Sequence, residues 1–80
     1  MQTIIHNGHK IEIIGWWKER VYYDGNEVSG KWSIMGSTHV FRVKENGTDI
    51  QYEVTLNIRW HGCTFWTEVR REGIIIYTNR

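Results

Sequence analysis

The segment from Ile50 to Trp60 carries a large apolar residue at every second position. These residues are Ile50, Tyr52, Val54, Leu56, Ile58 and Trp60, and polar residues fill the positions between them. Because successive side chains of a β-strand point to opposite faces, the pattern predicts a long strand with one buried and one solvated face. A helix would spread the same six residues around its whole circumference. The sequence therefore predicts a sheet with one buried side.

Glycine-containing dipeptides divide the rest of the chain into further strands. They are Asn7-Gly8, Asp24-Gly25, Gly36-Ser37, Asn46-Gly47, His61-Gly62 and Glu72-Gly73. Asn-Gly and Asp-Gly are strong hairpin signals, because both central residues of a type I′ turn need positive φ. Eight strands are expected, at residues 2–6, 9–14, 17–23, 27–34, 38–45, 49–60, 63–71 and 74–79.

Two-residue turns at these sites would align the side chains of neighbouring strands. The aligned pairs are Ile4 with Ile11, Val21 with Val28, Trp17 with Trp32, Phe41 with Tyr52, Val43 with Ile50, Lys44 with Asp49, Glu53 with Arg70, Val54 with Val69 and Ile58 with Phe65. Apolar residues meet on one face and opposite charges on the other, which a slip of one residue would destroy. The pattern favours an all-β antiparallel meander that forms a β-sandwich or an open barrel.

Composition limits the class of protein further. Eighty residues make one domain, residues 1–80, and five Trp, four Tyr and two Phe supply material for a dense core. The net charge of +1 argues against a nucleic-acid partner, because domains that hold a phosphate backbone are usually far more basic. The single cysteine, Cys63, favours a reducing compartment. We expect a soluble cytoplasmic protein with no membrane-spanning segment.

Three groups of residues are candidates for chemical sites. His6 and His9 face each other across the first turn and are weak candidates for a metal site, although solvated histidines explain them as well. His61 and Cys63 flank a tight turn with no residue to orient the imidazole, which favours an inert thiol. The strand carboxylates are expected on solvated faces beside basic residues, and they are Glu12, Glu19, Glu53 and Glu68. We therefore predict a non-enzymatic protein without a catalytic site or cofactor.

Aromatic residues on the outward parity are stronger candidates for a binding surface. Trp17, Trp32 and Trp60 fall on core positions, whereas the outward set is Trp16, Tyr22 and Trp66, with Arg20 and Arg70. Such a surface suits a protein partner, with stacking of a glycan or single-stranded nucleic acid as the alternative. Coverage of both faces within the fold or by a dimer would also explain it.

The final strand is an uninterrupted apolar run. Its residues, Ile74-Ile75-Ile76-Tyr77-Thr78, suit a sheet centre or an edge that takes a partner. Because it is the last strand of the chain, an edge position and a homodimer through that edge are both reasonable expectations.

Motifs in the first half of the chain resemble those of a known family. His9-Lys10-Ile11-Glu12, then Lys18-x-Arg20-Val21-x-Tyr23-Asp24-Gly25-x-Glu27 and Trp32, are similar to the opening strands of the Fas apoptotic inhibitory molecule family. The resemblance extends over most of residues 9–80 and implies one all-β, sandwich-like unit with a non-enzymatic role. The animal protein carries two such units, and the family offers no catalytic or cofactor residues. Trp16-Trp17 depart from the pattern, since relatives carry small or polar residues there.

Overall fold

The computed structural model describes residues 2–15, 18–32, 36–59 and 64–79. Eight strands form: β1 Gln2–His6, β2 His9–Ile14, β3 Lys18–Tyr23, β4 Asn26–Trp32, β5 Gly36–Glu45, β6 Thr48–Arg59, β7 Thr64–Arg71 and β8 Ile74–Thr78. Each predicted strand is present, with its ends within two residues of the prediction. The all-β class and the antiparallel meander are confirmed.

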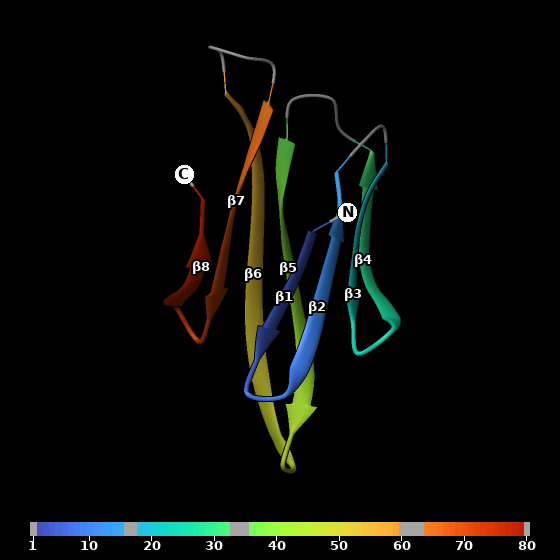
Figure 1. Cartoon of the computed structure of the whole chain (residues 1–80). Coiled ribbons are helices and arrows are strands. Elements are labelled where there is room, and N and C mark those ends of the chain that lie inside the picture. The colour runs from blue at the N-terminus through green and yellow to red at the C-terminus, as the bar shows by residue number, and fades with distance from the viewer. Residues whose placement is uncertain (1, 16–17, 33–35, 60–63, 80) are drawn as a thin grey trace.

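The strands form two separate four-stranded sheets that pack face to face (Figure 1). The first sheet has the order β1-β2-β3-β4 and the second the order β5-β6-β7-β8, with every neighbouring pair antiparallel. The molecule is therefore a sandwich of two meanders, not a closed barrel. This topology leaves β1 and β4 at the edges of the first sheet, and β5 and β8 at the edges of the second.

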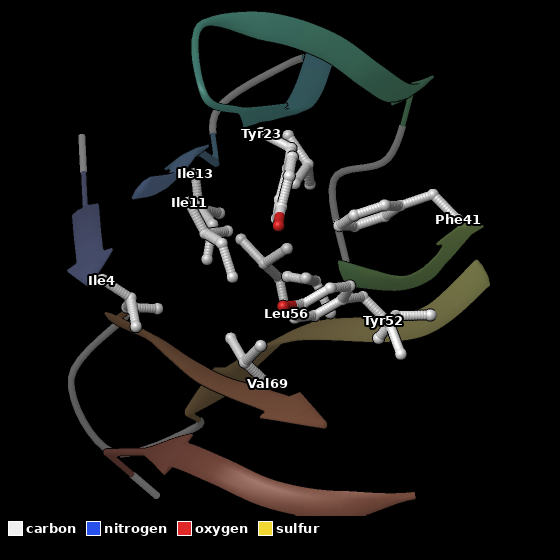
Figure 2. Packing of buried hydrophobic residues seen from close by; sticks show 11 residues of the cluster. Ile4, Ile11, Ile13, Tyr23, Phe41, Tyr52, Leu56 and Val69 are labelled. Atoms are coloured by element: carbon white, nitrogen blue, oxygen red, sulfur yellow. The ribbon is translucent and has the colours of Figure 1, made fainter. Parts of the chain in front are cut away.

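Apolar side chains from both sheets meet between them (Figure 2). The alternating apolar residues of β6 are buried as predicted, from Ile50 through Leu56. The buried apolar set is Ile4, Ile11, Ile13, Val21, Tyr23, Phe41, Ile50, Tyr52, Val54, Leu56 and Val69. The predicted core positions Trp17 and Trp60, and the side chain of Trp32, lie outside the described part of the chain.

The predicted register holds in most hairpins. Ile4 lies opposite Ile11, Phe41 opposite Tyr52, and the pairs of β6 with β7 are as expected. The type I′ geometry is present at Asn46, whose φ is 53°, and at Gly47, whose φ is 79°. The chemistry of these turns therefore sets the strand alignment.

The register predicted for β3 and β4 is wrong. Val21 lies opposite Ser29 rather than Val28, and Trp32 lies opposite Lys18 rather than Trp17. The turn itself forms as predicted, but Val28 is an extra residue in β4 and shifts all later pairs by one position. Such a β-bulge leaves the turn intact and re-aims the side chains that follow it. Here it places Ser29 opposite a core residue.

The break predicted at Gly36-Ser37 is also wrong, because both residues belong to β5. Gly36 has a φ of 108°, and a Cβ atom there would lie 2.3 Å from the carbonyl oxygen of Leu56. Glycine is required by this close approach to β6, and it does not mark the end of a strand.

Candidate interaction surface

The outward residues predicted as a binding surface are divided between the two sheets. Arg20 and Tyr22 alternate with buried residues of β3, so they lie on the outer face of the first sheet. Trp66 and Arg70 alternate with buried residues of β7 and lie on the outer face of the second sheet. Trp16 is outside the described residues. The structure thus places the four described residues on opposite faces of the sandwich and not on one surface.

The local surroundings of these residues also differ. Tyr22 is half-buried and lies opposite Glu12 on one side and Glu27 on the other. Arg70 is exposed, and its Nε donates to Oε2 of Glu68 at 2.9 Å along the same strand. The outer face of the first sheet therefore presents an aromatic ring between carboxylates. The outer face of the second sheet presents an exposed ion pair within one strand.

His9 contacts the turn between β3 and β4. His6 lies opposite His9 as predicted, but His9 Nδ1 lies 2.7 Å from Oδ2 of Asp24. The backbone amide of Lys10 donates to Oδ1 of Asp24 at 2.8 Å. Both contacts lower the pKa of Asp24, and the hydrogen bond from the Lys10 amide has the larger effect. Among the described residues, no three His, Cys, Asp or Glu side chains are grouped to hold a metal ion, and the pair His61 and Cys63 lies outside them.

A buried polar cluster joins β3 of the first sheet to β5 of the second. Glu19 is 1 % exposed and His39 is fully buried, with Nε2 of His39 3.0 Å from Oε1 of Glu19. Oγ of Ser29 lies 2.7 Å from Nδ1 of His39, and Ser37 donates its hydroxyl to Oε1 of Glu19. The expectation of a solvated Glu19 is wrong, because Glu19 shares its strand face with Val21 and Tyr23. We call Glu19, His39, Ser29 and Ser37 the histidine cluster.

A second buried polar cluster surrounds Glu45 at the end of β5. Tyr23 donates its hydroxyl to Oε2 of Glu45 at 2.6 Å, and Tyr52 donates to the same oxygen. The guanidinium of Arg71 donates from Nη2 to Oε1 of Glu45 at 2.6 Å. Burial opposes ionisation of Glu45, but the three donors overcome that effect and lower its pKa to about 2. Burial and the bond to Glu45 in turn raise the pKa of Tyr23. We call Glu45, Tyr23, Tyr52 and Arg71 the tyrosine cluster.

Both clusters connect the two sheets through buried side chains that satisfy one another's hydrogen-bonding groups. Oε2 of Glu19 is the exception in the described chain, since it is buried without a hydrogen-bond partner. The clusters were missed because a polar residue inside a strand pattern is normally assigned to the solvated face. For Glu19 and Glu45, however, strand parity alone indicates an inward position.

A shallow polar depression lies on the outer face of the second sheet. Its lining residues are Arg42, Asp49, Gln51 and Glu72. Arg42 donates to the side-chain oxygen of Gln51, and the backbone N–H of Gln51 donates to Oε1 of Glu72 at 2.8 Å. These groups mainly satisfy one another and stabilise the turns nearby.

Exposed apolar residues gather at strand edges. The four large hydrophobic side chains exposed in the described chain are Ile5 in β1, Val40 in β5, and Ile74 and Ile75 in β8. Ile74 is 70 % exposed and Ile75 is 48 % exposed. All three strands are edge strands, so apolar surface coincides with backbone groups available for strand pairing.

β1 and β8 share one side of the sandwich. Nε2 of Gln2 donates to the hydroxyl of Tyr77 at 2.6 Å and joins the two strands across the sheets. Neither strand contains Asp, Glu, Lys or Arg, whereas the edge strands β4 and β5 both carry such charges. Edge strands usually carry charged residues that prevent unwanted pairing. We call the two edge strands β1 and β8, which belong to different sheets, the neutral edge.

Comparison of the chain with protein-family models, with curated proteins and with solved structures finds no match. Across the described residues there is also no helix with the length and apolar character needed to cross a membrane.

Proposed function

We propose that this chain is a non-enzymatic protein-interaction domain that binds its partner through the neutral edge. The observation that carries the proposal is the coincidence of exposed isoleucines with an uncharged edge strand in β8. An extended segment of a partner can add to such an edge, where the backbone supplies hydrogen bonds and alternate side chains supply specificity.

The distribution of the aromatic residues favours this edge over a stacking ligand. A glycan or single-stranded nucleic acid would need aromatic rings gathered on one platform, whereas Tyr22 and Trp66 lie on opposite faces. The resemblance to the Fas apoptotic inhibitory molecule family agrees with a non-enzymatic all-β unit, and that assignment remains part of the proposal.

The substitution Ile75→Glu tests the proposed contact. Ile75 lies opposite Arg70, so a glutamate there gains an oppositely charged neighbour within the sheet and the fold is expected to survive. The new charge would be desolvated on strand addition, and each 1.4 kcal/mol of lost binding free energy is a factor of about ten. We expect recovery of the bound partner in an affinity pull-down from native lysate to fall about tenfold.

Val40→Lys is the matched control. Val40 is 55 % exposed, lies on the outer face of the same sheet at its other edge, and faces Glu53. This variant also replaces an exposed apolar residue with a charge opposite its countercharge. We expect it to retain full partner recovery. Equal recovery by the unmodified chain and the Ile75→Glu variant, both folded by circular dichroism, would rule out the neutral edge as the contact.

A further inference from the structure

We propose that the neutral edge takes a second copy of this chain, with β8 pairing antiparallel to β8 of that copy about a two-fold axis at Ile75. The proposal rests on the proposed function, because it names the partner of the same edge. Strand addition between identical edges gives a closed two-fold dimer, which is the commonest symmetry of protein oligomers.

The backbone of β8 presents Ile75 to a partner. Glu72 and Gly73 form a two-residue turn with φ values of 51° and 79°, and Arg71 lies opposite Ile74 next to this turn. In such a hairpin the closing pair exchanges backbone hydrogen bonds, and the following pair points its amide and carbonyl groups outward. The next pair is Arg70 with Ile75. The amide and carbonyl of Ile75 therefore face away from β7, toward the open edge.

The bonds made by neighbouring residues agree with this alternation. The amide of Glu72 donates to the carbonyl of Gln51 in β6, and the amide of Asn79 donates to the carbonyl of Thr67. Alternate residues of β7 therefore bond to β6 and to β8 in turn, which is the order that turns Ile75 outward.

Self-pairing at Ile75 brings together only uncharged residues. About that axis Ile75 meets Ile75 of the second copy, and Ile74 meets Ile76 of the second copy. About such an axis, residues at equal distances on opposite sides of the axis residue face each other, and only the axis residue faces its own copy. A self-paired β4 or β5 would have to accommodate charged residues such as Lys31 or Arg42 in its ladder, whereas β8 has no charged residue.

The expected dimer is weak. β8 is five residues long, and the register shift beyond Ile75 limits the ladder to the segment before Tyr77. An interface built on so short a ladder falls below the ~1,200 Å² of total area buried in stable complexes. We therefore expect a dissociation constant between about 10 μM and 1 mM, within the range of transient pairs.

Cysteine cross-linking tests the axis directly. In an antiparallel hydrogen-bonded pair the Cα atoms lie about 5.5 Å apart, within the range that a disulfide spans. The variant Ile75→Cys, in a Cys63→Ala background that removes the only native thiol, should form a covalent dimer in a glutathione redox buffer. Val40→Cys in the same background is the matched control for random collision. We expect Ile75→Cys to cross-link at least about tenfold faster.

Sedimentation equilibrium of the unmodified chain supplies a second measurement that needs no substitution. We expect the weight-average mass to rise toward that of a dimer as the concentration approaches about 1 mM, and Ile75→Glu to abolish the rise. A monomer over this whole range, or equal cross-linking rates for the two cysteine variants, would overturn the self-pairing. If Ile75→Glu still removes a captured partner in that case, the neutral edge remains the contact and only its occupant is different.

Discussion

Replacing either Glu19 or His39 with leucine is expected to destabilise the fold by about 3–5 kcal/mol, because each change leaves one buried polar partner uncompensated. Replacing both together is expected to cost clearly less than the sum. The two side chains are 1 % and 0 % exposed and lie 3.0 Å apart between the sheets, so leucines at both positions would extend the apolar core. Buried ion pairs replaced by well-packed apolar residues are often neutral or stabilising.

Urea unfolding followed by tryptophan fluorescence measures the three free energies of unfolding. Glu27→Leu is the control, since Glu27 is an exposed glutamate in a strand of the same sheet, and its replacement should change stability by no more than about 0.5 kcal/mol. Should the single leucine variants not fold, Glu19→Gln and His39→Gln give the same cycle with smaller losses. A double variant whose loss equals the sum of the two single losses would contradict the coupling.

Strand positions and most of the register were predictable from the sequence. Alternation fixed the inward face of β6, because Ile50, Tyr52, Val54 and Leu56 all had to be buried together. Dipeptides such as Asn46-Gly47 located the turns, because few other pairs of residues adopt positive φ at both central positions of a hairpin turn. Local chemistry was sufficient at these places, and the long-range pairs followed from it.

The bulges and the buried polar clusters were not predictable in the same way. Val28 adds one residue to β4 without any local signature, so the turn at Asp24 gave the wrong partner for Val21. His39 and Glu45 are stabilised by residues about 20 positions away, in the other sheet. Strand parity places these side chains inward, but only the packing of the two sheets reveals the partners that satisfy them.

The sequence also could not show which outward residues share one surface, because that depends on how the strands divide between the two sheets. Strand parity correctly predicted that Tyr22 and Trp66 point away from the interior. It does not indicate which strands share an outer face. The division of the meander into two sheets between β4 and β5 places these two rings on opposite sides. By contrast, the apolar run of β8 left a sheet centre and an edge as alternatives, and the strand order of the second sheet shows that β8 is an edge strand.

The tyrosine cluster is expected to make the fold sensitive to acid. Three donors hold the pKa of Glu45 at about 2, below its ordinary value of 4.5. A carboxyl group whose pKa is lower in the folded state stabilises the fold above its unfolded pKa, and that stabilisation is lost as the pH falls. We therefore expect the free energy of unfolding to decrease between about pH 4.5 and pH 2.

Glu45→Gln isolates this contribution, because the amide keeps an acceptor for the tyrosine hydroxyls but cannot be protonated in this range. The variant should be less stable at pH 7 by about 1.5–3 kcal/mol, the usual value of a hydrogen bond to a charged group. Its stability should then change less between pH 4.5 and pH 2 than that of the unmodified chain. Glu53→Gln, which changes a half-buried glutamate in the neighbouring strand, should leave the acid profile intact. Parallel acid profiles for the unmodified chain and Glu45→Gln would show that Glu45 is not the group responsible.

The same cluster predicts an opposite response at high pH. Burial and the bond to Glu45 raise the pKa of Tyr23 and of Tyr52, so both phenols stay neutral in the folded state above pH 10, their ordinary pKa. The stabilisation from a raised pKa is complete below pH 10 and is lost as the pH rises further, because the unfolded chain releases these protons first. Absorbance at about 295 nm should therefore show the phenols of Tyr23 and Tyr52 ionising only together with unfolding. In Tyr52→Phe one of these two late steps should disappear, and the remaining late phenol would be Tyr23. Ionisation of Tyr23 and Tyr52 near pH 10 in a chain that remains folded would show that neither hydroxyl is held by Glu45.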